Sequence, residues 1–219
     1  MNCIVTAGPT FEPLDDVRRL TNFSTGRLGT ELANHLTACG HSVTLLIGES
    51  ATWPGERRAS RVEVFTSTKD LQAKLKVFSR KKVDAIFHAA AVSDFSFGKM
   101  FVRRDGGKLV SFKPTKKIST RGGSLLVELV PTPKIIAELR GWFPRTCIIG
   151  WKFEADGGRA DALRAARKQM NECSTNACVA NGPAYGKGFA IVTAHGQKHF
   201  ATREKLYAAL EKTLAFARH

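Results

Sequence analysis

Short apolar runs alternate with segments of helical spacing along the whole 219-residue chain, and this alternation restricts the fold more than any other feature. Apolar runs of strand length lie at residues 3–7, 43–47 and 83–88. Between the first two, leucines at four-residue spacing predict a helix over residues 25–39, which Gly40 ends. Strands that alternate with helices are typical of a mostly parallel sheet. We therefore expect one open α/β sheet with helices on both faces.

The rest of the chain continues this alternation of predicted strands and helices. Further predicted strands lie at residues 61–65, 125–128, 146–150 and 177–180, and further helices at 68–78, from about 133, and at 159–171. Residues 189–193 and 198–201 flank a turn at Gly196 and predict a terminal β-hairpin. Leucines at 206, 210 and 214 predict a last helix. In an open sheet of this kind we expect ligands outside the carboxyl ends of the strands.

Net charge is the one unusual bulk property. The chain carries 34 Lys and Arg against 19 Asp and Glu, a formal charge of +15, which suits an anionic partner. Residues 99–121 hold eight basic side chains and one acidic one, Asp105, which leaves +7 on that segment. We expect a basic flexible loop at about residues 95–121. Composition alone allows either a solvated loop or a mobile lid over phosphates.

Several classes of protein are disfavoured by what the chain lacks. No apolar run approaches the roughly 18 residues of a membrane helix, and the N-terminus has no basic region, so we expect a cytoplasmic protein. Five dispersed cysteines argue against a disulfide framework and for reduced, mostly buried thiols. His195 and His199 lie around a predicted hairpin tip, which argues against a metal site there.

Two glycine-containing segments are candidates for phosphate binding. Gly8 and Thr10 directly follow the first strand, but the G-x-G-x-x-G fingerprint is missing and a long loop precedes the helix, which weakens a nicotinamide interpretation. Ser24, Thr25 and Gly26 open directly into that helix, where free N–H groups suit a polyphosphate. A simple N-cap at Ser24 explains the same residues without a ligand.

Polar and small residues at two other places are further candidates. Asn22 offers both a donor and an acceptor beside the predicted anion turn. Three successive alanines follow the strand at residues 83–88 and allow a flat ligand to approach the backbone, although simple packing also explains them. Asp94 follows them and could bind a cation or a hydroxyl group.

The combined pattern resembles the phosphopantothenate-cysteine ligases of coenzyme A biosynthesis. The resemblance covers nearly the whole chain and rests on six blocks, of which the first is the most specific. They are VTAGPTFEPLDDVRRLTNFSTGRLGTELA from Val5, HAAAVSDF from His88, KKI from Lys116, LVPTPKIIAEL from Leu129, IGWKFE from Ile149 and CVAN from Cys178.

The resemblance implies a Rossmann-like fold and a single nucleotide-binding ligase domain over residues 1–219. It implies an enzyme that couples 4′-phosphopantothenate to cysteine through an acyl nucleotide, consumes CTP or ATP with Mg²⁺, and releases pyrophosphate. Asn22 and Lys117 match the family's catalytic residues, and Arg18 with Asn22 the substrate-binding ones. The residues that match its nucleotide site are Gly8, Thr10, Ser24, Thr25, Gly26, Ala89, Ala90, Ala91, Asp94 and Asn181, with Asp94 also near the metal.

The chain departs from the family pattern at two places. The interval between Asp94 and Lys117 is longer than expected, so the matching lysine could instead be Lys116 or Lys113. Trp151 and Lys152 stand where the family usually has Phe and Ala. The flavin-dependent decarboxylase half that often precedes this domain is absent, so we expect a stand-alone ligase with a possible separate decarboxylase partner. The family also implies a homodimer.

Two rival functions stay open. A nicotinamide-dependent oxidoreductase of similar fold is disfavoured by the missing glycine fingerprint and by the lack of a Tyr-x-x-x-Lys pair. A nucleic-acid-binding module is favoured by the charge of +15 but has neither interleaved aromatic platforms nor a recognition motif. The residues leave the choice between CTP and ATP open, because it depends on backbone geometry at the alanines and near Asn181.

Overall fold

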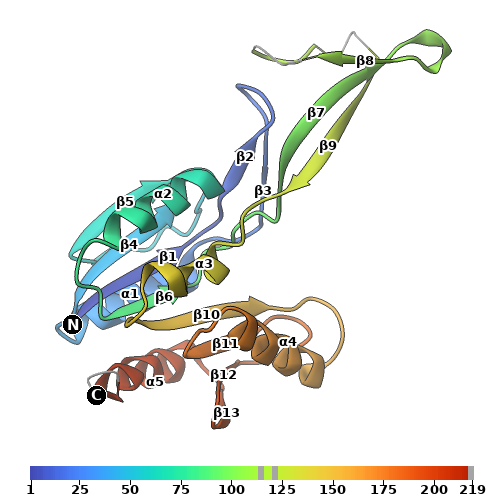
Figure 1. The fold of residues 1–219 in the computed structure, drawn as a ribbon. Helices are drawn as coiled ribbons and strands as arrows, with labels where there is room; N and C mark the ends of the chain where they lie inside the picture. The colour runs from blue at the N-terminus through green and yellow to red at the C-terminus, as the bar shows by residue number, and fades with distance from the viewer. Residues whose placement is uncertain (113–115, 120–122, 217–219) are drawn as a thin grey trace.

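An eight-stranded sheet forms the centre of the molecule in the computed structural model, which describes residues 1–112, 116–119 and 123–216 (Figure 1). Its strand order is β13-β12-β11-β10-β6-β1-β4-β5, and the pairs from β11 to β5 are all parallel. Both pairs that involve β12 are antiparallel. The strands are β1 (Asn2–Ala7), β4 (Ser42–Gly48), β5 (Arg61–Phe65), β6 (Ala85–His88), β10 (Cys147–Phe153), β11 (Ala177–Asn181), β12 (Phe189–Thr193) and β13 (Gly196–Phe200).

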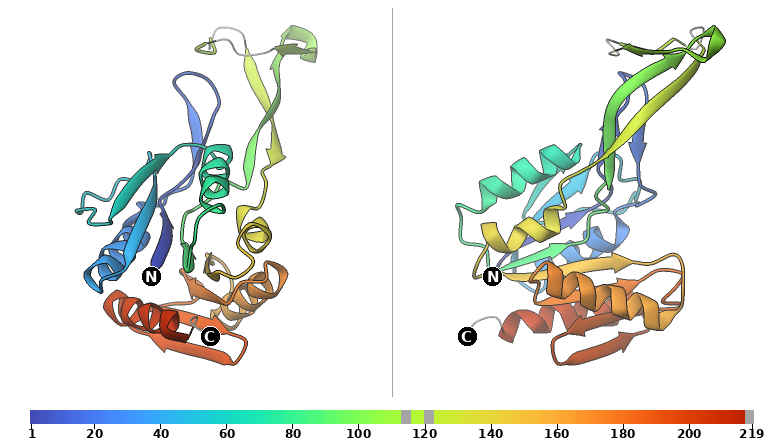
Figure 2. Two further views of the ribbon diagram at one scale, coloured as in Figure 1. Left: turned by 60° about the vertical axis from the view of Figure 1, so that its left-hand side comes forward. Right: turned by 45° about the vertical axis from the view of Figure 1, so that its right-hand side comes forward.

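Helices cover both faces of this sheet (Figure 2). Adjacent residues of a strand point to opposite faces, so Val5 and Ile4 of β1 belong to different cores. The core around Val5 includes residues of α1 (Arg27–Ala38) and α5 (Arg203–Phe216), and the core around Ile4 includes residues of α2 (Thr68–Phe78) and α3 (Ile135–Trp142). A third cluster joins α4 (Arg159–Glu172) to β11 and β12. The expected α/β sheet, with its C-terminal hairpin and helix, is confirmed.

The order of the strands reverses between β1 and β6. From β1 the chain moves outward through α1 to β4 and then β5, and it returns to place β6 on the other side of β1. In open α/β sheets such a switch point opens a crevice at the carboxyl ends of the strands, where ligands bind. Thr6 and His88 are register partners near these ends.

The sequence predicted a long loop between β1 and α1, but much of this segment has regular structure. It folds into an antiparallel hairpin of β2 (Phe11–Pro13) and β3 (Arg19–Thr21), with Phe11 opposite Thr21 and Pro13 opposite Arg19. Each strand has only three residues, too few to give a recognisable alternating pattern. The hairpin carries the chain away from the sheet and back to the start of α1 (Figure 1).

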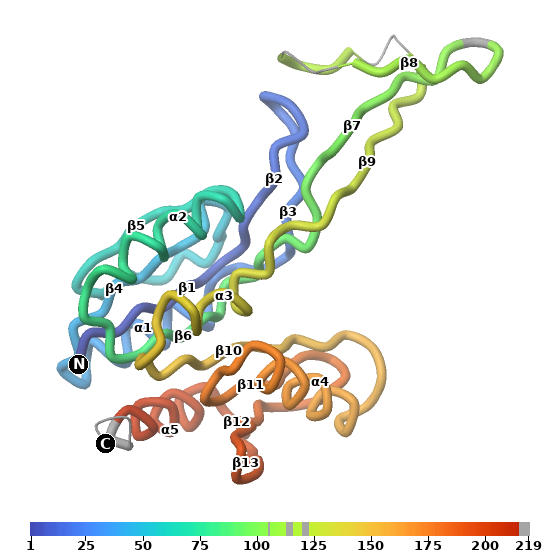
Figure 3. Tube along the Cα trace, in the orientation of Figure 1, coloured from blue at the N-terminus to red at the C-terminus, as the bar shows by residue number. Residues whose placement is uncertain are grey.

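The expectation of a loop at about residues 95–121 is wrong for much of that segment. It contributes β7 (Phe95–Arg103) and β8 (Leu109–Phe112), separated by the short 3₁₀ turn Asp105–Gly107. With β9 (Ser124–Pro131) these strands form a three-stranded antiparallel arm, which projects away from the main sheet (Figure 3). The aromatic residues of β7 favour a strand, and pairing with β9 outweighs the basic charge that suggested a loop. Residues 113–115 and 120–122, including Lys113, lie outside the described residues.

All five cysteines lie in the described chain and none is bonded to another. Four of them are buried as expected, whereas Cys39 is exposed. Burial raises the pKa of the Cys3 and Cys178 thiols to about 12, so both are protonated at neutral pH. Among the described helices, none is long and apolar enough to span a bilayer.

Candidate active site

The segments that follow β1 and β6 lie side by side at the switch point. The Ala91 N–H donates to the Gly8 carbonyl at 2.9 Å, and the Thr10 N–H donates to the Ala91 carbonyl at 3.1 Å. Pro9 and Ala91 thereby form a parallel bridge that prolongs the pairing of β1 with β6. The structure thus brings together four residues that the sequence had placed in one site: Gly8, Thr10, Ala89 and Ala91.

Thr10 is fully buried, and its hydroxyl forms hydrogen bonds with other groups of the protein. The Ser93 N–H donates to Thr10 Oγ1 at 2.8 Å, and Thr10 Oγ1 in turn donates to Ser93 Oγ at 3.2 Å. The Thr68 hydroxyl lies 3.3 Å from the same oxygen. Thr10 therefore fixes the turn after residues 89–91, and its side chain has little freedom to reach a ligand.

Asn22 is exposed and lies directly against these residues. Its Nδ2 donates to the carbonyls of Ala91 and Val92, both at 3.2 Å. Two carbonyl acceptors settle which end of the carboxamide is the nitrogen. The Oδ1 atom then points away from them, with no hydrogen-bond partner among the described residues. The side chain is held in one orientation and keeps an acceptor for a ligand.

Helix α1 begins beside the same edge. Its N-cap is Gly26, whose φ of +80° favours glycine, so the N-cap that we considered at Ser24 is wrong. The Thr25 hydroxyl accepts from the Arg27 N–H at 3.3 Å, Gly26 has no side chain to cap the N–H groups that follow, and no acidic residue lies in the first turn. Gly29 lets α1 approach β1 closely, since a Cβ atom there would lie 2.6 Å from the Ala7 Cβ. A helix start with uncapped N–H groups attracts anions. We call residues 8–10, 22, 24–26 and 89–91 the inner site.

A buried histidine, His88, lies next to the inner site, and it was not predicted as a site residue from the sequence. His88 Nδ1 lies 3.0 Å from Thr6 Oγ1, and the same hydroxyl oxygen accepts from the Ala90 N–H at 3.1 Å. Burial lowers the pKa of His88 to about 4, so the ring is neutral at physiological pH. Its position at the carboxyl end of a predicted strand was the one available signal.

Asn181 lies farther along the sheet, at the end of β11. Strands β10 and β6 separate it from β1, a distance of about 14 Å at the usual strand spacing. Its Oδ1 is buried without a hydrogen-bond partner among the described residues, and so is Trp151 Nε1 on β10. The strand register places both side chains on the face that α1 covers. One acceptor and one donor are therefore available there, and Trp151 is a candidate that the sequence marked only as a departure.

Asp94 is exposed at the base of the arm, where its carbonyl accepts from the Thr132 N–H at 3.0 Å. Within the described ranges, no three metal-binding side chains come together. A carboxylate in such a setting fits Mg²⁺ only when the ligand supplies most of the oxygens, as nucleotide phosphates do.

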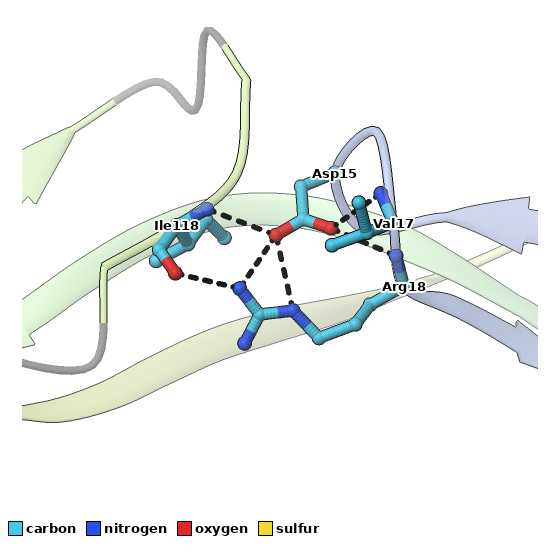
Figure 4. Close-up of polar contacts among 4 residues, drawn as sticks. All are labelled: Asp15, Val17, Arg18 and Ile118. Carbon is cyan, nitrogen blue, oxygen red and sulfur yellow. Dashed lines mark hydrogen bonds and ion pairs between the residues drawn. The ribbon is translucent and has the colours of Figure 1, made fainter.

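Arg18 and Lys117 lie apart from the inner site. Arg18 is at the far end of the hairpin, four residues from Asn22 along β3, which corresponds to roughly 13 Å. There it contacts Asp15 and the backbone of Ile118, the residue after Lys117 (Figure 4). Lys116 and Lys117 are both exposed. We call Asp15, Arg18 and residues 116–119 the outer cluster. The structure thus divides most of the predicted site residues between the inner site and the outer cluster, and leaves Asp94 and Asn181 outside both.

Known proteins share this architecture. Residues 1–214 match the family described as the DNA/pantothenate metabolism flavoprotein C-terminal domain. A solved protein of that name from Streptococcus pneumoniae is 27% identical, with a TM-score of 0.86 over 99% of both chains. A mutant of Cab2 in complex with phosphopantothenate-cysteine has a TM-score of 0.76 at 19% identity, over 98% of this chain and 87% of that one. At this identity it shows the fold alone.

One relative is the coenzyme A biosynthesis bifunctional protein CoaBC of Thermococcus kodakarensis. It is 34% identical over 178 residues, which are 81% of this chain and 40% of the relative. The chain therefore spans about two fifths of that protein. The resemblance found in the sequence is confirmed at the level of the family, because the match runs almost from end to end. The chain belongs to the DNA/pantothenate metabolism flavoprotein C-terminal domain family.

Proposed function

We propose that the protein is a phosphopantothenate-cysteine ligase that uses CTP or ATP. The observation that carries the proposal is the orientation of Asn22, whose amide is held by the carbonyls of residues 91 and 92 beside the uncapped start of α1. This arrangement places an oriented polar side chain next to an anion-binding turn. Activation of a carboxylate by a nucleoside triphosphate needs these two features together.

The inner site would hold the nucleotide. Backbone N–H groups at residues 24–26 and in the first turn of α1 suit the triphosphate, and Gly8 packs closely beside Gly26, where a Cβ atom would lie 3.3 Å from the Gly8 Cα. Residues 89–91 offer a narrow edge for the base and ribose. Asn181 and Trp151 supply an acceptor and a donor farther along the sheet. Base choice between CTP and ATP would depend on these backbone and amide contacts.

Two displacement steps follow from this assignment. The substrate carboxylate attacks the α-phosphorus, and pyrophosphate leaves to give an acyl nucleotide. The cysteine amine then attacks the acyl carbon, loses a proton, and displaces the nucleoside monophosphate as the amide forms. Asn22 would orient the reacting groups, with its Oδ1 able to accept from the cysteine amine. Lys117 would stabilise the negative charge that develops on the transferring group after its segment moves toward the inner site. Arg18 would bind the phosphate of 4′-phosphopantothenate.

Mg²⁺ would be held by Asp94 together with nucleotide oxygens, and it would offset phosphate charge when bound. We also propose a homodimer, because exposed apolar side chains gather on the hairpin and the arm. They are Val17, Leu20, Phe95, Leu109, Val110 and Leu129. A separate flavin-dependent decarboxylase as partner and a cytoplasmic location complete the proposal. Sedimentation of the purified chain as a monomer at micromolar concentration would contradict the dimer.

The test of the function is a pyrophosphate-release assay with 4′-phosphopantothenate, cysteine and Mg²⁺, run with CTP and with ATP. We expect release that needs 4′-phosphopantothenate, and an amide product that needs cysteine as well. Release that is independent of 4′-phosphopantothenate would indicate a simple nucleotidase. No release with either nucleotide, together with reduction or oxidation of a nicotinamide cofactor, would support the oxidoreductase instead.

A further inference from the structure

Asp15 is the centre of the outer cluster and receives five hydrogen bonds from three residues (Figure 4). Its Oδ1 accepts from the backbone N–H groups of Val17 and Arg18, at 3.0 and 2.8 Å. Its Oδ2 accepts from Arg18 Nε at 3.1 Å, from Arg18 Nη2 at 2.7 Å and from the Ile118 N–H at 3.0 Å. One carboxylate thus joins the turn of the hairpin to a segment about a hundred residues away.

The second half of the contact comes from Arg18. Its Nη2 also donates to the Ile118 carbonyl at 2.7 Å, so both backbone groups of Ile118 are engaged by the hairpin. The Asp15 side chain has no exposed surface and the Ile118 residue is buried. Exposed ion pairs contribute little, but a shielded carboxylate with five donors is a different case. Consistent with these bonds, the pKa of Asp15 lies well below its usual range, chiefly because of the Ile118 N–H bond.

The side chains around this contact carry mostly positive charge. Arg18 contacts the backbone of Ile118, which directly follows Lys116 and Lys117, so this contact brings together two segments with three positive side chains, whose charges repel one another without a counter-charge. Asp15 supplies that charge from the side of the protein. Arg18 keeps its Nη1 without a hydrogen-bond partner among the described residues and is 40% exposed, so it can still bind an anion.

We propose that Asp15 is a positioning residue that joins Arg18 and residues 116–119 into one preformed unit, so that Arg18 and Lys117 act together on the anionic groups of the substrate. This inference rests on the proposed function. It assigns Asp15 no contact with the substrate. Its role is to fix the position of the Arg18 guanidinium relative to the segment that carries Lys117.

Asp15→Asn tests this role selectively. The amide oxygen can still accept from the N–H groups of Val17 and Arg18, so the turn is kept. The amide nitrogen cannot accept from the Arg18 side chain or from the Ile118 N–H, so these three bonds are lost and the connection to residues 116–119 is reduced to the Arg18 Nη2 bond with the Ile118 carbonyl. Asp16→Asn is the matched control, because Asp16 is the next residue of the same turn and is exposed. Thermal unfolding of both variants checks that the fold is kept.

Two readouts separate positioning from folding. Amide hydrogen exchange of peptides that contain Ile118 should become roughly tenfold faster in Asp15→Asn and stay unchanged in Asp16→Asn. In the ligase assay, Asp15→Asn should lower kcat and raise the KM for 4′-phosphopantothenate, each by about tenfold, with the nucleotide KM within about twofold.

Unchanged exchange at Ile118 would overturn the proposal, and so would faster exchange with normal kcat and KM. An equal loss in both variants would also overturn it, because general charge loss would then suffice. If the wild-type chain shows no ligase activity, the proposed function fails. The exchange of Ile118 still decides in that case whether Asp15 holds this segment.

Discussion

The inner site and the outer cluster are built by different means. In the inner site, backbone groups of residues 8–10 and 89–91 bond to each other as a continuation of two parallel strands. In the outer cluster, a carboxylate and a guanidinium bond to the backbone of Ile118, and the described residues 116–119 around it belong to no strand. The first arrangement depends on the register of the main sheet, and the second depends on the charge of one residue.

This difference suggests a division of labour. Groups fixed by a sheet need no reorganisation when a ligand arrives, which suits the binding of a nucleotide. Groups held by side-chain contacts can move as a unit, which suits closure of the outer cluster on the 4′-phosphate of the substrate after it binds. Substitutions in the two regions should therefore have different signatures.

The largest effect is expected from Asn22→Ala. Loss of the oriented Asn22 side chain beside the reacting group should lower the rate of pyrophosphate release by about a hundredfold or more, which is the usual scale for the loss of one preorganised polar group. The fold should survive, because Asn22 is exposed and its contacts are two carbonyl bonds. The control is Asn34→Ala, which also removes an exposed amide bonded to backbone groups. Asn22 does not belong to the site if both variants keep normal turnover.

A smaller loss is expected from Lys117→Gln. Pyrophosphate release should fall about thirtyfold while nucleotide affinity falls no more than about threefold, because the inner site keeps its own phosphate contacts. Lys116→Gln and Lys113→Gln serve as controls for general loss of charge. Similar small losses in all three variants would mean that the segment acts through the combined electrostatic field of its lysines. A collapse confined to Lys116→Gln would move the catalytic role by one residue.

The rigidity of the inner site can be tested through Gly29→Ala. A Cβ atom at position 29 would lie 2.6 Å from the Ala7 Cβ and 3.0 Å from the Thr6 carbonyl, so α1 must shift from β1. We expect about 2 kcal/mol of lost stability in urea unfolding, together with weaker nucleotide binding. Gly141→Ala is the control, because nothing lies within 4 Å of its Cβ position in α3, and it should be neutral or stabilising. Equal effects of the two changes would refute the close-packing argument.

The smallest expected effect is a pH dependence from His88. The folded pKa of about 4 lies below the ordinary value of 6.5, so between these values the unfolded chain binds a proton that the folded chain does not. Stability should therefore fall as the pH is lowered from 6.5 toward 4. Urea unfolding at pH 7 and pH 5 should show about 1 to 2 kcal/mol more loss for the wild type than for His88→Asn. Parallel pH curves for the two proteins would show that His88 is not the titrating group.

The sequence predicted the inner site better than the outer cluster, for a physical reason. Gly8 and the alanines follow predicted parallel strands, whose carboxyl ends meet at one edge, and Asn22 shortly precedes the helix that was predicted to begin at the same edge. No local pattern could show that Asp15 receives the N–H of Ile118, because that contact joins two distant segments. The hairpin and strands β7 and β8 of the arm were missed on similar grounds, since these strands are short or basic and gain stability from pairing, whereas the strand predicted at residues 125–128 lies within β9. Arg18, which the resemblance matched to a substrate-binding residue, lies at the turn end of β3.

The division of labour is tested most directly by amide hydrogen exchange of the wild-type protein with ligands added in turn. With a nucleoside triphosphate and Mg²⁺ alone, we expect protection of residues 8–10, the start of α1 and residues 89–91, and no change in peptides that contain Ile118. Addition of 4′-phosphopantothenate should then protect the Ile118 peptides as well. Protection of the Ile118 peptides by the triphosphate alone, with the inner site unchanged, would contradict the account.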